Sequence, residues 1–222
     1  MRPSTVPALP TGGEGRTGRT RSMRVVGARQ HGPMEPLPEH LEHDGLVLRR
    51  WTAGDAELVG NLVAANIEHL RPYMPWIEHE PLALEARREL GYGWDATWAA
   101  GGDVIYGIYE DGVGVGGTGL HRRLGPGGLE IGYWVHVDHL GKGIARRASE
   151  GLTSLAFTLP GIERVEIHHD LTNVHSRRVP EQLGFHLMGK SKVPRTPQAP
   201  ADCGVDLVWR TTRDEWLAAH PA

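Results

Sequence analysis

The stretch from Ile131 to Leu159 constrains the fold of this chain more than any other part of its sequence. It begins with an apolar segment at 131–135, continues through a turn with two glycines at 140–145, and ends in a helix-forming segment at 148–159. A strand, a glycine-rich turn and a helix in this order direct several backbone N–H groups and the positive end of the helix dipole toward one point. The stretch therefore predicts a binding site for an anion such as a phosphate group.

Two well-known phosphate-binding loops do not match this sequence. A Walker loop requires a glycine five residues before its Gly-Lys pair and a Ser or Thr after the pair, but these places hold His136 and Gly143. The spacing G-x-G-x-x-G occurs at 112–117 and again at 114–119. It leads into another turn rather than a helix, so a dinucleotide-binding loop is excluded. We expect this glycine-rich stretch to be the flexible centre of a β-hairpin.

The periodicity of the apolar residues and the positions of turn residues predict the other elements. Strands are expected at 44–51, 104–109, 113–122, 129–136, 164–169, 185–190 and 205–210, and helices at 58–70, 82–98, 174–183 and the carboxyl terminus. Thr52 and Asp55 have the spacing of a capping pair. Turns at 110–112 and 125–128 join three strands into an antiparallel meander. The helix after the glycine turn forms a crossover, so strand 164–169 is expected to run parallel to strand 129–136.

Four segments of the chain carry a family pattern, in the order Leu46–Asp55, Arg71–Trp76, Glu130–Val135 with Gly141–Ala145, and Asn173–Ser176 with Glu181–Phe185. Together they resemble the GNAT superfamily of acyl-CoA-dependent N-acyltransferases, and within it the RimJ/RimL-like group, over roughly 45–209. The resemblance implies an α/β (α+β) fold. Its central sheet would be mixed and mostly antiparallel, with about seven strands, a splayed parallel pair and flanking helices. The family's turn motif usually begins with Gln or Arg, whereas here that position is Leu140.

The same resemblance implies an enzyme that transfers an acetyl group from acetyl-CoA to a primary amine by direct attack. The acceptor would be a protein N-terminus or a small-molecule amine. Two alternatives stay open at this point. One is a non-catalytic acyl-CoA-binding module, and the other is a transferase that uses another donor such as succinyl-CoA.

Acetyl-CoA is expected to lie along the end of strand 129–136 and over the glycine turn. A larger side chain at Gly143 or Ala145 would keep its pyrophosphate away from the backbone. Lys142, Arg146 and Arg147 are expected to help hold the phosphates. The full set of expected cofactor-binding residues is Val135, His136, Val137, Leu140, Gly141, Lys142, Gly143, Ile144, Ala145, Arg146 and Asn173.

Glu130 is the first candidate for the general base that deprotonates the amine. Strand alternation places it on the same face as Gly132 and Trp134, and many relatives have an acidic residue there. The alternative is a solvated carboxylate with no chemical role, and burial decides between them. His168 and His169 are alternative bases, and since they are adjacent on a strand, at most one of them can point into the site.

Ser176 is expected to protonate the leaving thiolate, and Asn173 to bind the pantetheine amide, as the RimJ/RimL-like pattern implies. Helix capping by the same two side chains is the alternative, and the two roles are compatible. The acceptor is expected to contact Arg71, Tyr73, Trp76 and Trp134, together with Met74 and Glu80. The alternative for this loop is that it only packs two helices together.

Residues 1–43 contain glycine, arginine and proline with almost no apolar periodicity. Such a segment cannot bury enough surface to offset the entropy of ordering, so we expect 1–43 to be a disordered leader and 44–222 to be the acyltransferase domain.

The formal net charge of −3 gives no sign of nucleic-acid or anionic-membrane binding, and no apolar run reaches the ~18 residues of a spanning helix. The single cysteine, Cys203, fits a cytoplasmic protein. Thirteen histidines occur without metal-ligand spacing, so no metal is expected. A homodimer remains open.

Overall fold

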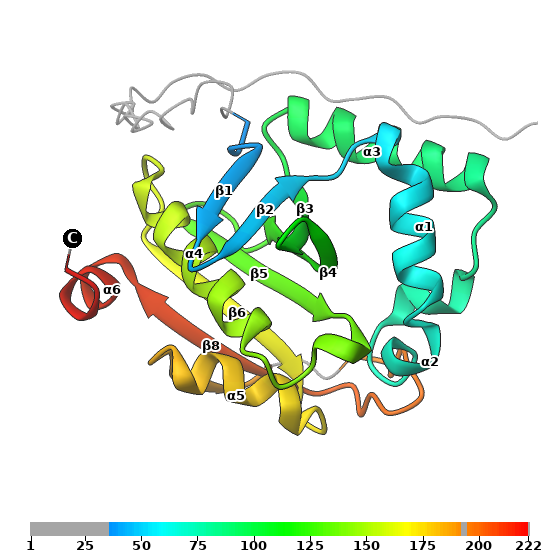
Figure 1. Cartoon of the computed structure of the whole chain (residues 1–222). Helices are drawn as coiled ribbons and strands as arrows, with labels where there is room; N and C mark the ends of the chain where they lie inside the picture. The colour runs from blue at the N-terminus through cyan, green and yellow to red at the C-terminus, as the bar shows by residue number, and fades with distance from the viewer. Residues whose placement is uncertain (1–35, 192–194, 222) are drawn as a thin grey trace, which may run out of the picture. The chain divides into compact units, whose positions relative to one another are not determined.

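The computed structural model describes residues 36–191 and 195–221. These residues form a sheet of eight strands in the order β1-β2-β3-β4-β5-β6-β8-β7, shown in Figure 1. Neighbouring strands are antiparallel except β5 and β6, which are parallel. The strands are β1 (His40–His43), β2 (Leu46–Arg50), β3 (Val104–Glu110), β4 (Val113–His121), β5 (Gly128–Val135), β6 (Arg164–Asp170), β7 (His186–Lys190) and β8 (Asp206–Thr212).

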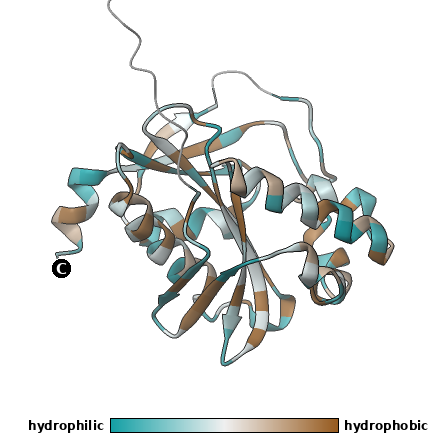
Figure 2. Cartoon of the chain, turned by 90° about the horizontal axis from the view of Figure 1, so that it is seen from above, coloured by the Kyte–Doolittle hydropathy of each residue, from teal (hydrophilic) through white to brown (hydrophobic). Residues whose placement is uncertain are grey.

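Helices cover both faces of the sheet. The α-helices are α1 (Ala56–Ala64), α2 (Ile67–Leu70), α3 (Leu84–Ala99), α4 (Ile144–Thr158), α5 (Val174–Gln182) and α6 (Arg213–Ala219), and the 3₁₀ turns are η1 (Ala53–Asp55), η2 (Pro75–His79) and η3 (Val137–His139). One hydrophobic cluster joins the sheet to α4, α5 and α6, and a second lies with α1, α2 and η2 on the other face. Figure 2 shows apolar residues along the inner strands of the sheet, as expected for strands covered on both sides.

The expected meander and crossover are both confirmed. Asp111 and Gly112 adopt positive φ angles of 50° and 78° in the turn between β3 and β4, as a tight hairpin turn requires. Thr52 and Asp55 form the predicted capping box. The predicted helix end at Gly184 is also present, since this residue has a φ of 74° directly after α5.

The parallel pair separates at its carboxyl end, which is the feature that creates the site. The pairing of β5 with β6 extends only from Gly128–Arg164 to Ile131–Ile167. Beyond it, β5 runs on to Val135 and β6 runs on to Asp170. Over this length β5 remains paired with β4 on its other side, so an opening forms between β5 and β6.

Residues 36–43, which were expected in the leader, pack against the rest of the described chain. Leu37 is buried in the main core, and β1 at 40–43 pairs with β2. This additional strand is why the sheet has eight strands instead of about seven. The remainder of the expected leader, 1–35, lies outside the described residues.

The helical stripe expected along 58–70 is divided into α1 and α2. Asn66, at the break, is buried and its side-chain N–H donates to the carbonyl of Leu62. Its side-chain oxygen accepts the backbone N–H of Val137 at 2.8 Å. The break therefore ties the end of α1 to the segment that follows β5.

The glycine-rich stretch is also different from the expected flexible hairpin centre. Only Gly112 lies in the turn, while Gly114 lies inside β4 and pairs with β3, and Gly116, Gly117 and Gly119 lie inside β4 and pair with strands on both sides. A Cβ at Gly116 would come 2.3 Å from the carbonyl oxygen of Trp134. These glycines allow close packing rather than flexibility.

Candidate active site

The turn between β5 and α4 has the form of an anion site. Gly141 and Gly143 both adopt a φ of 75°, and α4 begins at Ile144 without any side-chain cap. A Cβ built on Gly143 meets no atom within 4 Å, so its backbone faces open space. The first N–H groups of an uncapped helix are available to a phosphate, and the turn therefore fits the pyrophosphate of CoA.

The other expected residues of the turn contribute in different ways. Leu140 and Lys142 are exposed, whereas the side chain of Ile144 is buried in the main core. Ala145 lies in the first turn of α4 and is half-buried. The side chain of Ile144 is therefore part of the core and does not face the turn.

Backbone N–H groups near the end of β5 divide into two sets. The N–H of His136 donates to the carbonyl of Val115 on β4, and the N–H of Val137 donates to Asn66. Both of these N–H groups therefore have internal partners in this structure, although His136 and Val137 were expected among the cofactor-binding residues. Because N–H directions alternate along a strand, those of Tyr133 and Val135 point toward the opening beside β6.

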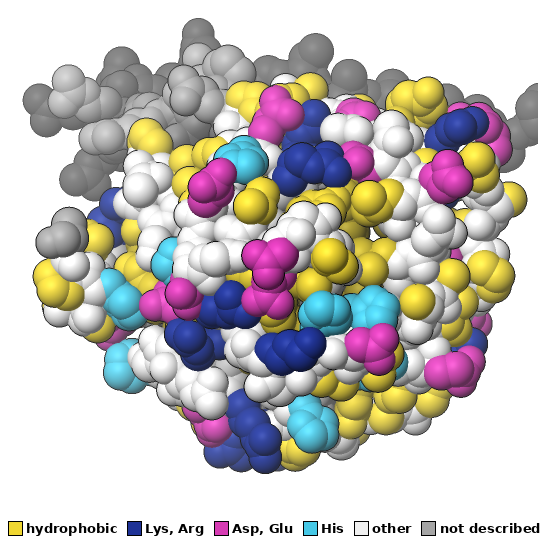
Figure 3. All heavy atoms as spheres, viewed as in Figure 1, with side chains coloured by type: hydrophobic (Ala, Val, Ile, Leu, Met, Phe, Trp, Pro, Cys, Tyr) yellow, Lys and Arg dark blue, Asp and Glu magenta, His cyan; other side chains and the backbone are white. Residues whose placement is uncertain are grey.

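The arginines at the start of α4 are occupied by acidic partners. Arg146 bonds to Glu150 at 2.7 Å, while Arg147 bonds to Glu110 at 2.6 Å and to the carbonyl of Asp44. The bond from Arg147 holds the pKa of Glu110 below its usual range. On the face that carries α4, Figure 3 shows basic and acidic side chains beside one another rather than a patch of one sign. Arg147 therefore joins α4 to the carboxyl end of β3 in this structure.

Two hydroxyl groups meet at the opening between β5 and β6. The hydroxyl oxygens of Tyr133 on β5 and Ser176 on α5 lie 2.9 Å apart, and the Tyr133 hydroxyl also donates to the Ser176 carbonyl at 3.1 Å. Burial raises the pKa of Tyr133, although the bond to Ser176 opposes this, so the phenol stays protonated at neutral pH. Asn173 accepts the backbone N–H of Ser176 and thus caps α5.

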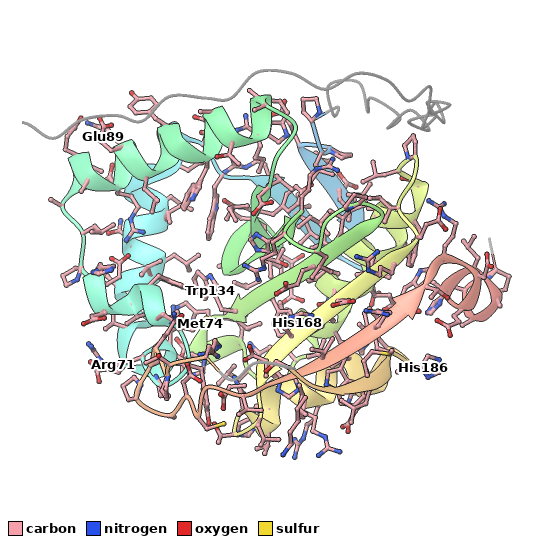
Figure 4. All side chains as sticks on the ribbon, turned by 180° about the vertical axis from the view of Figure 1, so that it is seen from behind. Arg71, Met74, Glu89, Trp134, His168 and His186 are labelled. Carbon is pink, nitrogen blue, oxygen red and sulfur yellow. The ribbon has the colours of Figure 1, made fainter. Side chains whose placement is uncertain are left out.

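A large cavity lies on the face of the sheet that α1 and α3 cover. Its volume is about 1280 Å³, and it extends from α3 to Asn173 and Ser176 beside the opening. Figure 4 shows Trp134, Met74 and His168 on this side of the sheet, with Arg71 farther out. The cavity is apolar toward α3 and polar toward β6 and β8.

Glu130 belongs to a buried polar cluster in this cavity. The residue is 6% exposed, and its carboxylate takes two hydrogen bonds from Arg123, one of them at 2.7 Å. Glu166, on the neighbouring strand, bonds to His168 at 2.6 Å. The other ring nitrogen of His168, Nδ1, lies 3.7 Å from Glu130 Oε2. Glu130 is therefore buried and paired, and a solvated carboxylate is excluded.

The two adjacent histidines have opposite environments, as alternation requires. Burial alone would lower the pKa of His168, but the hydrogen bond that its ring donates to Glu166 and the charge of Glu130 raise it. His169 faces away from the cluster, where its Nε2 accepts the indole N–H of Trp209 at 3.0 Å, and burial lowers its pKa. His168 is therefore the one of the two that faces Glu130.

The loop expected to cover the acceptor contributes most of its residues to the cavity. Tyr73, Met74, Trp76 and Glu80 line it, together with Trp134. Tyr73 also donates a hydrogen bond from its hydroxyl to the carbonyl of Thr172. Glu80 is bound by the buried guanidinium of Arg87 at 2.6 Å.

Arg71 is not among the residues that line the cavity. It is exposed and forms an ion pair with Glu68 at 3.2 Å. The prediction that Arg71 fixes a charged acceptor therefore lacks support from its position. Other residues of the loop line the cavity, but the direction in which its first side chain points does not follow from the sequence.

Several cavity residues were not expected from the sequence. Tyr133 and Trp51 lie within family segments but had no expected role, while Glu166 and Trp94 have no motif around them. Glu166 lies two residues before His168 on the same strand, so alternation alone places both on one face. Among residues 36–191 and 195–221, no group of three His, Cys, Asp or Glu side chains has the arrangement of a metal site. No helix in these ranges is long and apolar enough to cross a membrane.

Comparisons with known proteins agree with this geometry. A family model described as an acetyltransferase (GNAT) domain matches residues 45–186. The putative ribosomal N-acetyltransferase YdaF of Bacillus subtilis (strain 168) is 29% identical over 151 residues, which cover 68% of this chain and 82% of that protein.

Solved structures share the fold. RimL, a ribosomal L7/L12 alpha-N-protein acetyltransferase solved in complex with coenzyme A, superposes with a TM-score of 0.70 at 20% identity, covering 78% of this chain and 98% of RimL. Mycobacterium smegmatis RimJ, solved with CoA-disulfide, gives a TM-score of 0.70 at 23% identity, covering 84% and 97%.

Proposed function

Because this chain belongs to the acetyltransferase (GNAT) domain family, we propose that it transfers an acetyl group from acetyl-CoA to a primary amine. The observation that carries the proposal is the opening between β5 and β6. This opening lies between the glycine turn and a cavity that holds both Glu130 and Ser176. RimL and RimJ, which share the fold, were solved with CoA or its disulfide.

The reaction needs no covalent enzyme intermediate. The amine nitrogen bonds to the acetyl carbonyl carbon, the carbon–sulfur bond breaks, and the sulfur leaves as a thiolate. An ammonium acceptor therefore releases two protons, one of which returns to the thiolate. The N–H groups of Tyr133 and Val135 point into the opening, where one of them is positioned to stabilise the developing charge on the carbonyl oxygen.

In this proposal Glu130 accepts a proton from the amine and His168 receives it from Glu130. The Oε2–Nδ1 separation of 3.7 Å supports this order, and a modest shift of either side chain would bring it to hydrogen-bond length. The imidazolium that results would be stabilised by Glu166. Arg123 holds Glu130 in place through two hydrogen bonds, and His168 provides a second acceptor for the proton.

The thiolate proton would come from Ser176, with Tyr133 supporting the hydroxyl. Both lie beside the opening, and the raised pKa of Tyr133 keeps a proton available. Asn173 holds the first turn of α5 and so fixes the position of Ser176.

Two acceptor classes fit this chemistry. YdaF and RimL carry names of ribosomal or protein N-acetyltransferases, which supports a protein N-terminus. The cavity of about 1280 Å³ equally supports a small amine. The single cysteine supports a cytoplasmic location as part of this proposal.

The test combines binding with turnover. Calorimetry with acetyl-CoA and succinyl-CoA identifies the donor, and thiol release with a panel of amines detects transfer. In Glu130→Gln, CoA affinity should change little while turnover falls by about 10²–10⁴-fold. Tight CoA binding without thiol release for any peptide or amine would instead establish a non-catalytic module.

A further inference from the structure

Four tryptophans form a continuous row along one side of the cavity. Their ring centroids are 6.2 Å apart for Trp94 and Trp51, 6.3 Å for Trp51 and Trp134, and 6.3 Å for Trp134 and Trp76. They come from separate parts of the chain: α3, the end of β2, β5 and η2. All four line the same cavity, so the fold brings together an aromatic surface that no local motif encodes.

Glycines in the sheet make room for these rings. A Cβ at Gly117 would lie 2.6 Å from Trp134 Nε1 and 2.9 Å from Trp51 Cη2, and a Cβ at Gly107 would lie 2.3 Å from Trp51 Nε1. Contacts this short are not tolerated by real side chains. The indoles of Trp51 and Trp134 therefore lie directly on the backbone of β3 and β4, which fixes their position.

The row extends from the core to the mouth of the cavity. Trp51 is 3% exposed, while Trp76 is 37% exposed. Trp51 is therefore the buried part of the row. Trp76, together with Met74 beside it, remains accessible to a molecule that enters the cavity. A fixed aromatic surface with one accessible end is suited to a flat apolar group.

The carboxylates that line the cavity are already paired with arginines. Glu130 is bound by Arg123, and Glu80 is bound by Arg87. Asp206 and Asp170 are both contacted by Arg195, at 2.9 and 4.0 Å. Within the described lining, this leaves no unpaired acidic side chain to hold a second ammonium group, so a polycationic acceptor is disfavoured.

The orientation of the acceptor molecule in the cavity follows from the side chains on one face of β5. Glu130 and Trp134 lie on the same face of this strand, with Gly132 between them. An amine nitrogen beside Glu130 therefore places the remainder of its molecule along Trp134 and toward Trp76.

Resting on the proposed acetyl transfer, we infer that the acceptor is a primary amine with one positive charge and a flat aromatic body that packs against Trp134 and Trp76. Two sources share this chemistry. One is a free arylalkylamine, and the other is a peptide whose N-terminal residue is aromatic.

The first experiment compares matched amines in the acetyl-CoA assay with the full chain. 2-Phenylethylamine and ethylamine differ only by the ring, and kcat/KM should be about tenfold or more higher for the former. Spermidine should be a poor acceptor. Peptides that begin with Phe or Ala identify the source, since a preference for the Phe peptide over 2-phenylethylamine indicates a peptide N-terminus.

A matched pair of variants tests whether the preference for an aromatic amine depends on the row of four tryptophans. Trp76→Ala should remove most of the preference for 2-phenylethylamine over ethylamine. Trp98→Ala should keep it, because Trp98 stacks on Arg50 and is not part of the cavity lining. Should Trp76→Ala fail to fold, calorimetry of the unsubstituted protein saturated with CoA provides a second measurement, in which 2-phenylethylamine binds and ethylamine does not.

The inference and the proposed function fail in different ways. Equal kcat/KM for the two amines, a preference for spermidine, or an unchanged preference in a folded Trp76→Ala would overturn the inference while acetyl transfer stands. Absence of acetyl-CoA binding, or of thiol release with every amine, would overturn the proposed function itself.

Discussion

The hydroxyl oxygens of Tyr133 and Ser176 lie 2.9 Å apart, although the two residues are 43 positions apart in the chain. Tyr133 points from β5 toward the face that α4 and α5 cover, whereas Glu130 points to the opposite, cavity face. The opening between β5 and β6 joins these faces. In the proposed reaction, one proton leaves on the cavity face and the other is returned from the face of α5.

The hydroxyl groups of Tyr133 and Ser176 should act together in the release of the thiol. Ser176→Ala should reduce the rate of thiol release by about 10²-fold, and Tyr133→Phe should reduce it less, because the serine hydroxyl remains. The double variant should be little worse than Ser176→Ala, since both changes remove the same interaction. Steady-state rates at several pH values measure this, with exposed Tyr92→Phe as the control. Additive losses would mean that the two hydroxyls act separately.

The role of the glycine turn in CoA binding can be tested separately from the effect of a substitution on stability. Gly143→Val and Gly112→Val both place a side chain at a φ near 75°, at 75° and 78°, and both positions are open. Each should lower stability by about 1–2 kcal/mol. Only Gly143→Val should weaken CoA binding, because its side chain occupies the space over the turn. Thermal unfolding and calorimetry measure the two effects, and equal CoA affinity in both variants would place the phosphates elsewhere.

The close packing of the indoles predicts different costs for two glycines of β4. Gly117→Ala should destabilise the protein by about 1–3 kcal/mol, since its Cβ would lie 2.6 Å from Trp134 Nε1. Gly114→Ala should be much milder, because its nearest neighbour is Leu62 Cδ2 at 3.5 Å. Urea unfolding of both variants measures the difference. Similar midpoints would show that the indoles shift at little cost.

The adjacent histidines should titrate in opposite directions from their ordinary pKa of about 6.5. The pKa of His168 is raised, despite its burial, by Glu166 and Glu130, so its charged form stabilises the fold. That contribution is fully present below about pH 6.5 and is lost as the pH rises through the raised value. Burial lowers the pKa of His169, so the unfolded chain takes up a proton more readily and stability falls below about pH 6.5.

NMR titration of the two ring signals measures both pKa values. The stability of His168→Gln and His169→Gln across the pH range checks the sign of each contribution. Glu166→Gln should lower the pKa of His168, since it removes the hydrogen-bonded carboxylate. An unchanged His168 titration in that variant would contradict the assigned contact.

Local features of this protein were determined by its sequence. The turn at Asp111–Gly112, the capping box of Thr52 and Asp55, and the helix end at Gly184 each depend on residues within a few positions. The parallel direction of β6 follows from a helical crossover, which is also a local feature. Glu130 was placed on the correct face by alternation alone.

The partners of those residues were decided only by the tertiary structure. Arg123 faces Glu130 because β4 and β5 pair in one register, and Arg147 bonds to Glu110 because β3 ends beside α4. Leu37 joins the core through a segment with no periodicity of its own. A sequence pattern specifies direction along one element, whereas contact between distant residues depends on how elements pack, and packing is a property of the whole set of side chains.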